Sequence, residues 1–326
     1  MTLSRRDALA GAMLGLLSPS GLLAQAPFPS RPVRFVVPYP PGGIADAMAR
    51  LLQAPLQAQL GVPVIVENRA GAGGNLGTDL VVKSAADGHT LLFGASGPLA
   101  VNQTLYKGRL GYDPQRDLRG VAQLAAFPLV LVAHRKLPAS TVTEFLAWLR
   151  GEPDAQSYAS AGNGTPQHLA AELFARSAGV KLVHVPYRGA ALAMIDLVPG
   201  RVPFMFEIAG GAIPHVRSGS LKAIAVTSEQ RLKALPGVPT LSESGLPGFD
   251  FTAWNGASVP AGTSDAVVAR LNEVFQHVLR EPAIQQKWDE LGSLVVSGPP
   301  AQFDRLVRAE SRRLGALVTE LGLVPD

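Results

Sequence analysis

Short apolar runs alternate with amphipathic segments along the first third of the chain. The run at 33–37 predicts a buried strand that ends at Pro38, and the segment 43–60 has apolar residues at helical spacing. Pro55 lies inside this segment, so we expect a kink there or a helix in two pieces. The next predicted elements are strand 62–66, helix 75–84 and strand 89–95. This alternation of apolar strands with helices predicts a parallel α/β sheet.

A second unit of similar layout follows a polar, turn-rich linker at 109–120. It contains a strand through Ala159, a loop of small residues at 160–165 and a helix at about 166–178. The remaining predicted elements are strands 129–132, 181–186, 202–207 and 221–228, helices 141–149, 190–198, 264–280 and 300–321, and a Pro- and Gly-rich connection at 235–250. Two units joined by more than one crossing predict two lobes with a ligand cleft between them, lobe 1 being 27–127 with 229–326 and lobe 2 being 128–228.

The N-terminus has the pattern of a secretory signal peptide. A charged stretch with Arg5 and Arg6 precedes an apolar segment at 8–23, and Ala24-Gln25-Ala26 is an A-x-A cleavage site. The apolar segment is shorter than the roughly 20 residues of a spanning helix, and Gly and Pro interrupt it. We therefore expect residues 1–26 to be removed near Ala26 and the mature chain to reach the periplasm. The Arg pair suggests twin-arginine export, but Asp7-Ala8 continues that pattern weakly, so the Sec route stays open.

Composition narrows the possible chemistry. The 326-residue chain has no cysteine, which excludes thiol catalysis and Cys-based metal sites. Its net charge is +4, and the basic residues are dispersed without interleaved aromatics, so we expect no nucleic-acid partner. A mild positive balance suits the attraction of small acids.

Two loops of small residues follow predicted strands and precede predicted helices. One runs from Pro38 to Gly43 and the other from Gly71 to Gly77. Backbone N–H groups in such loops meet negative groups, so the pair predicts a cleft that holds an anion. The second loop imitates a dinucleotide fingerprint, but it reads G-x-G-G-x-x-G, and no acid follows at 93–96. Its other interpretation is a helix-start turn that needs small residues, and we expect no cofactor.

The sequence shows no catalytic or metal-binding constellation. Ser96 lies in Gly-Ala-Ser-Gly-Pro, which is not a G-x-S-x-G elbow, and Ser160 with His168 has no evident third partner. The six histidines lack metal-ligand spacing. We expect His168 to be the one histidine near the cleft and the chain not to be an enzyme.

Three charged residues each allow two interpretations. Asp46 either complements the dipole of the helix after the first loop or holds that loop, or an ordered water, against a ligand. Arg188 either pairs with a carboxylate or is a solvated loop cation. Glu207, at the end of a predicted strand, either meets a ligand amine or caps a helix.

Many short motifs, in order along the mature chain, resemble the Bug-type periplasmic receptors, the solute-binding proteins of tripartite tricarboxylate transporters. The first motifs are Arg31-Pro32-Val33, Pro41-Gly42-Gly43 with Asp46, Glu67-Asn68-Arg69 with Gly71-Ala72-Gly73-Gly74, Asp87-Gly88, and Tyr112-Asp113-Pro114. The later ones are Tyr158-Ala159-Ser160 with Gly164-Thr165 and His168-Leu169-Ala170, His184-Val185-Pro186-Tyr187, Ala225-Val226-Thr227-Ser228, Gly245-Leu246-Pro247-Gly248-Phe249, and Pro260-Ala261-Gly262-Thr263.

The resemblance implies a two-lobed α/β periplasmic-binding-protein fold of the Venus flytrap type, similar to type II, and no catalysis. It implies a small carboxylate ligand, captured by lobe closure and delivered to the membrane permease of a tripartite tricarboxylate transporter. Two features depart from the family: Glu207, where Asp is frequent, and the neighbouring Gly210-Gly211.

The loop argument and the resemblance together give a set of candidate ligand-binding residues. They are Tyr39, Pro41, Gly42, Gly43, Asp46, Ser96, Gly97, Ser160, Gly162, Asn163, Gly164, Thr165, His168, Arg188 and Glu207. We expect a monomer that binds no metal. Two alternatives stay open: an adaptor that senses the ligand for a membrane sensor kinase, and an exported α/β hydrolase.

Overall fold

The computed structural model describes residues 28–151, 154 and 156–325, so the predicted signal peptide lies outside the described residues. The elements up to the long central strand are β1 (Val33–Val37), α1 (Ile44–Leu60), β2 (Val64–Asn68), η1 (Ala72–Gly74), α2 (Asn75–Val82), β3 (Thr90–Ala95), η2 (Gly97–Val101), α3 (Asn102–Leu105), α4 (Pro114–Asp117) and β4 (Leu118–His134).

The elements after it are α5 (Val142–Gly151), β5 (Gln156–Ser160), α6 (Pro166–Ala178), β6 (Leu182–Pro186), α7 (Ala190–Leu197), β7 (Phe204–Ile208), α8 (Ala209–Arg217), β8 (Leu221–Val226), β9 (Thr252–Pro260), α9 (Asp265–Leu279), α10 (Pro282–Glu290), β10 (Leu294–Val295) and α11 (Pro300–Glu320).

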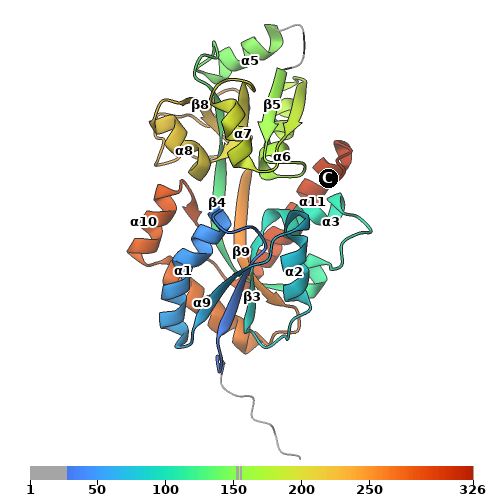
Figure 1. Ribbon diagram of the computed structural model, residues 1–326, viewed down its shortest axis with the longest axis vertical. Coiled ribbons are helices and arrows are strands. Elements are labelled where there is room, and N and C mark those ends of the chain that lie inside the picture. The colour runs from blue at the N-terminus through green and yellow to red at the C-terminus, as the bar shows by residue number, and fades with distance from the viewer. Residues whose placement is uncertain (1–27, 152–153, 155, 326) are drawn as a thin grey trace, which may run out of the picture.

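Strand β4 connects two groups of strands. The strand order is β2-β1-β3-β9-β4-β7-β5-β6, and β8 and β10 also pair with β4. Residues Leu118 to Pro128 of β4 pair with β9, and β4 pairs with β7 and β8 from Leu129 onward. We call the strands on the β9 side, with their helices, the β1 half and those on the β7 side the β5 half. Figure 1 shows the two halves one above the other, with β4 and β9 between them.

The sheet is mixed, so the prediction of a parallel sheet is only partly correct. Strand β1 pairs in parallel with β2 and β3, and β5 pairs in parallel with β6 and β7. Strand β9 is antiparallel to both β3 and β4, and β4 is antiparallel to β7 and β8. Parallel strands joined by helices therefore form the outer part of each half, and the antiparallel strands join the halves.

Several boundaries differ from the prediction. The predicted linker 109–120 overlaps the first three residues of β4, because this strand begins at Leu118 and not at residue 129. Helix α1 runs through Pro55 as one element, so the two-piece alternative is wrong. Sequence patterns missed β9, α8 and α10. Alternating small residues weaken the apolar signal of β9, and paired glycines with Pro214 weaken the helical signal of α8.

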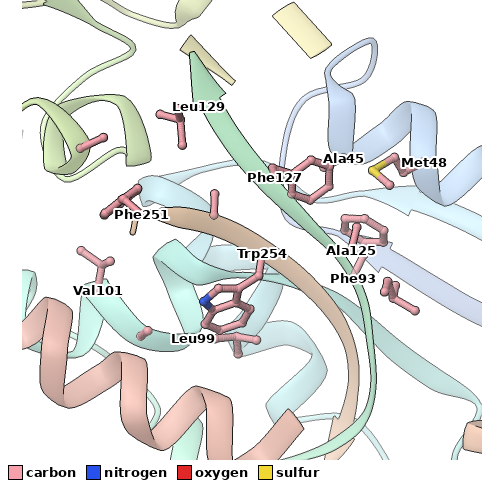
Figure 2. Close-up of a cluster of buried hydrophobic side chains, with 14 of the residues drawn as sticks. Ala45, Met48, Phe93, Leu99, Val101, Ala125, Phe127, Leu129, Phe251 and Trp254 are labelled. Atoms are coloured by element: carbon pink, nitrogen blue, oxygen red, sulfur yellow. The ribbon is translucent and has the colours of Figure 1, made fainter. Parts of the chain in front are cut away.

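The largest core lies on both sides of β4 and β9. Strand β4 is buried along almost its whole length, as expected for an apolar strand covered on both faces. Phe127 from β4, Phe93 from β3 and Met48 from α1 lie on one side in Figure 2, and Trp254 and Leu99 lie near α11 on the other. This packing fixes the strand ends from which the candidate loops emerge.

Candidate functional site

In the β1 half, three loops meet at the carboxyl ends of parallel strands. The loop after β1 contains Tyr39, the loop after β2 contains Gly74, and β3 leads through buried Ser96 into Gly97. A Cβ atom on Gly97 would lie 3.5 Å from Tyr39 Oη, and one on Gly74 would lie 3.5 Å from Tyr39 Cζ. The tyrosine ring therefore lies among the three loops. Burial raises the pKa of Tyr39, so its phenol stays neutral.

Asp46 holds the first loop in shape. Its buried carboxylate accepts hydrogen bonds from the Gly42 N–H (2.9 Å), Asn68 Nδ2 (3.0 Å) and Arg50 Nε (3.0 Å). Asn68 Nδ2 also donates to the Tyr39 carbonyl at 3.1 Å. The Arg50 hydrogen bond is the main cause that lowers the pKa of Asp46 to about 2. These contacts favour the interpretation that Asp46 holds the first loop in position.

The first turn of α1 presents backbone donors beside this loop. Gly43 is the N-cap, and no side chain caps the helix there. The first N–H groups of a helix have no partner within the helix, so they remain available to a negative group. Pro41, Gly42 and Gly43 are exposed, and Gly42 has φ +87°, which a non-glycine residue rarely adopts.

A polar cluster holds the loop after β2. Tyr112 Oη lies 3.1 Å from both Asn75 Oδ1 and the Pro98 carbonyl. Asn102 Nδ2 donates to the Gly73 carbonyl (3.2 Å) and to Asn75 Oδ1 (2.7 Å). These contacts tie the glycine-rich loop to η2 and α3, which follow Gly97.

In the β5 half, the loop 160–165 is folded around its own side chains. Ser160 Oγ accepts the Gly162 N–H at 3.0 Å, and Thr165 Oγ1 donates to the Gly162 carbonyl at 2.7 Å. The Gly164 N–H donates to His168 Nδ1 at 3.1 Å. Thr165 is the N-cap of α6 and Asn163 is half-buried. The loop is therefore ordered by a serine, a threonine and a histidine.

Two stacked histidines lie under this loop. The rings of His168 and His184 are 3.8 Å apart, and Ser160 Oγ is 2.6 Å from His184 Nε2. Burial, and then the neighbouring His184, lower the pKa of His168 to about 3, so that ring is neutral. The expectation that His168 is the one histidine near the cleft loops is wrong, because the β5–β6 register places His184 beside Tyr158 and under Ser160.

Ser160 is fully buried, and its hydroxyl is engaged in the loop. It does not offer the accessible nucleophile that a hydrolase needs. Its side chain orders the loop instead.

Arg188 and Glu207 lie next to the loop 160–165. Arg188 is exposed on the loop between β6 and α7, and its neighbour Gly189 donates its N–H to the Ala161 carbonyl at 3.1 Å. Glu207 is buried at the end of β7, and its Oε2 accepts from Gln167 Nε2 at 3.4 Å. Burial raises the pKa of Glu207 to about 7.

The two halves contact each other near these loops. A Cβ atom on Gly164 would lie 2.6 Å from Leu105 Cδ2 of α3, and one on Gly210 would lie 2.9 Å from the Leu291 carbonyl after α10. Arg176 of α6 forms an ion pair with Glu320 of α11. In Figure 1 the loops before α1 and α6 lie on the facing sides of the two halves.

The candidate residues thus form two groups. Tyr39, Pro41, Gly42, Gly43, Asp46, Ser96 and Gly97 lie in the β1 half, and Ser160, Gly162, Asn163, Gly164, Thr165, His168, Arg188 and Glu207 lie in the β5 half. Sequence reasoning missed the positioning roles of Asn68, Gln167 and His184. The signal for Asn68 was its place at the end of β2, where the parallel register sets it beside Val37.

Among the described residues, no group of three or more His, Cys, Asp or Glu side chains could hold a metal ion. In the same part of the chain, no helix is both long and apolar enough to cross a membrane.

Two α/β halves joined by long strands, with ordered loops at the facing strand ends, are typical of periplasmic solute-binding proteins. Known proteins support this class. The sequence model of the tripartite tricarboxylate transporter family receptor matches residues 48–323. Protein BugT of Bordetella pertussis is 35% identical over 323 residues, which are 99% of each chain.

Two solved structures extend the likeness to the fold. Rpa4515 of R. palustris with adipate is 32% identical with a TM-score of 0.83, covering 92% of this chain and 100% of that one. MatC of Rhodopseudomonas palustris with bound malate is 35% identical with a TM-score of 0.78, covering 89% and 100%.

The chain belongs to the tripartite tricarboxylate transporter receptor family. The resemblance to Bug-type receptors and the two-lobed periplasmic-binding-protein fold are both confirmed. The family is one of solute-binding receptors.

Proposed function

We propose that this chain is a periplasmic receptor that captures a small organic anion, a carboxylate, between the loops of its two halves. Family membership supports the receptor role, and solved relatives hold adipate and malate. In this chain, the observation that carries the proposal is a pair of loops held in shape by their own side chains, 39–46 with 96–97 in one half and 160–165 in the other, together with a helix start at Gly43 that no described side chain caps.

The ligand carboxylate meets backbone N–H groups other than those that the side chains already bind, among them the first-turn N–H groups of α1. Asp46 accepts the Gly42 N–H, Ser160 accepts the Gly162 N–H and His168 accepts the Gly164 N–H, so these side chains hold the loops in shape. Loops fixed before binding lose little conformational entropy when a carboxylate arrives, which favours affinity. Arg188 adds an exposed cation beside the second loop.

Contacts to both halves favour the closed arrangement, because a ligand shifts an equilibrium only through differential contacts. The closed complex then delivers the carboxylate to the membrane permease of a tripartite tricarboxylate transporter, and the receptor acts as a monomer. Lobe 1 comprises 27–127 with 229–326, and lobe 2 comprises 128–228.

Thermal unfolding in the presence of mono-, di- and tricarboxylates tests the carboxylate assignment. A ligand at 100 times its Kd should stabilise the protein by about 2.7 kcal/mol. Neutral amides of the same acids are the matched controls and should leave the midpoint unchanged. Stabilisation by the amides and not by the acids would contradict the proposal.

Solution scattering tests closure separately. The radius of gyration should fall when the best carboxylate of the thermal screen is added. Tight binding with an unchanged radius would remove lobe closure from the proposal and leave carboxylate binding intact.

A further inference from the structure

A cavity of about 610 Å³ lies between α7 and α8 in the β5 half. Most of its wall is apolar and includes Met194, Ile195, Val198 and Pro199. Two titratable side chains line it, Glu207 and His215. A cavity with an apolar wall and few polar groups favours a ligand with an apolar body and one polar end.

Glu207 is an unusual residue for such a wall. It is 4% exposed, and within the described residues no Lys or Arg side chain compensates its charge. An ionised carboxyl in this position is costly unless it gains a partner. Burial therefore raises the pKa of Glu207 to about 7, the signature of a carboxyl that lacks a cation.

The position of this carboxyl depends on Gly211 in α8. A Cβ atom on Gly211 would lie 2.5 Å from Glu207 Oε1, so any larger residue would displace the carboxyl. Glu207 Oε2 accepts from Gln167 Nε2 at 3.4 Å, a long contact. Glu207 and Gly211, the residues that set this chain apart in sequence, are therefore coupled in space.

The cavity neighbours the loop 160–165 of the proposed carboxylate site. Gln167, which contacts Glu207, lies in the first turn of α6 directly after the N-cap Thr165 and Pro166. Ala190, another wall residue, follows Gly189, whose N–H donates to the Ala161 carbonyl. The Ala190 end of the cavity therefore lies beside the loop 160–165, and Glu207 lines the same cavity.

We propose that the ligand is an amino-carboxylate, whose carboxylate meets the loops, whose apolar body lies against α7 and whose protonated amine pairs with Glu207. The inference rests on the proposed carboxylate function. A second ligand carboxylate in this place would meet the Glu207 carboxylate and be repelled, so Glu207 discriminates against dicarboxylates.

The surroundings of Glu207 set the expected pH dependence. Helix α6 presents the neutral amide of Gln167, α7 presents apolar side chains, and α8 presents Gly211 and, further along, His215. An amine binds the ionised carboxyl, so affinity for an amino-carboxylate should rise between pH 5 and pH 8. Affinity for a simple monocarboxylate should change little over that range.

Calorimetry with three matched sets tests the proposal. The probes are 6-aminohexanoate, hexanoate and adipate, with the four-carbon set 4-aminobutanoate, butanoate and succinate and the five-carbon set 5-aminopentanoate, pentanoate and glutarate. At pH 8, the wild-type protein should bind the amino acid of at least one set about tenfold tighter than its dicarboxylate. Glu207→Gln keeps the shape and should abolish that preference.

Gly211→Ala is the second variant. It keeps the charge but displaces the carboxyl, and it should weaken amino-acid binding about tenfold more than monocarboxylate binding. If Glu207→Gln does not fold, this variant and the wild-type pH series carry the test.

The outcomes separate the two claims. A dicarboxylate preferred by the wild type in every set, or an amino-acid preference unchanged in Glu207→Gln, would overturn the inference and leave the carboxylate receptor intact. Failure of all nine probes and of the acids in the thermal screen would overturn the proposed function and the inference with it.

Discussion

Side chains order both the loop 39–46 of the β1 half and the loop 160–165 of the β5 half by accepting backbone N–H groups, but the accepting groups differ in charge. In the first, the ionised carboxylate of Asp46 accepts the Gly42 N–H, and Arg50 and Asn68 hold that carboxylate. In the second, neutral acceptors do the same work: Ser160 for Gly162 and His168 for Gly164. Each loop is ordered before ligand arrives, one by a charge and one by neutral groups.

The difference separates their pH responses. The pKa of Asp46 is lowered to about 2, so its loop keeps its support down to strongly acidic pH. The pKa of His168 is lowered to about 3, whereas an unfolded histidine titrates near 6.5. The fold therefore opposes protonation of His168 between about pH 6.5 and pH 3. Over the same range Asp46 stays ionised, and the first loop keeps its support.

Removing the Asp46 carboxylate should lower the stability of the protein most. Asp46→Ala leaves the Gly42 N–H and Asn68 without their acceptor and Arg50 without its counter-ion. We expect the free energy of unfolding to fall by about 3 kcal/mol, measured by denaturant titration at pH 7, because two donors lose their acceptor. Glu290→Ala, which removes an exposed acid from an i,i+3 pair with Lys287, is the control and should leave stability nearly unchanged. Equal effects of the two substitutions would mean that Asp46 is an ordinary surface acid.

The role of neutral His168 should be visible as a loss of stability at acidic pH. Because the folded-state pKa of His168 lies below the unfolded value, the unfolded chain binds the proton first and stability falls as pH drops from about 6.5 toward 3. The slope approaches about 1.4 kcal/mol per pH unit, and the expected loss is about 2.5 kcal/mol between pH 6 and pH 4.

Glu207 opposes this slope between pH 4.5 and 6.5, because its pKa is raised in the folded state. The slope is therefore measured in a Glu207→Gln background. The double variant with His168→Gln is the control and should lack it. A flat profile in the single Glu207→Gln variant would show that His168 is not held neutral by the fold.

Glu207 itself should destabilise the protein at alkaline pH. Its folded-state pKa of about 7 exceeds the unfolded value, so stability is fully present at acidic pH and is lost as pH rises through 7. Glu207→Gln should therefore stabilise the apo protein by about 2 kcal/mol more at pH 8 than at pH 5, by chemical unfolding. A stability difference independent of pH would contradict the raised pKa.

The smallest expected effect comes from Gly43. A Cβ atom there would meet only the Pro40 carbonyl, at 3.9 Å, and φ is −80°, so a side chain is sterically tolerated. Gly43→Val should therefore leave the apo melting temperature nearly normal, yet crowd the first-turn amides of α1. Carboxylate affinity in calorimetry should fall by more than tenfold, about 1.4 kcal/mol.

Gly237→Val is the matched control, because that glycine has open space, a negative φ and a place in the connection 235–250. It should bind normally. Normal binding by the Gly43 variant would remove this turn from the site.

The sequence predicted the elements that carry the strongest periodicity. The strands β1 to β3 and the unit from β5 to α7 lie close to their predicted ranges, and the loop 160–165 is bounded as predicted by β5 and α6. Each of these segments combines an apolar run with a glycine-rich loop that ends it, so the local sequence pattern is enough to predict its bounds.

The remaining features depend on pairing between distant residues. Strand β9 has several small residues in its middle, and their place in the core becomes evident only when β3 and β4 flank them. His184 reaches Ser160 only through the β5–β6 register, and Asn68 reaches Asp46 only because β2 lies beside β1. No local motif encodes these contacts, and therefore the candidate list held the loops but lacked several of the side chains that order them.

The central claim is that one carboxylate contacts loops from both halves. A crystal structure of the complex with the tightest carboxylate from the thermal screen tests it most directly. The account predicts ligand oxygen atoms within about 3 Å of backbone N–H groups in both the 39–46 and the 160–165 loops. A ligand held by only one half, with its carboxylate away from these amides, would contradict it.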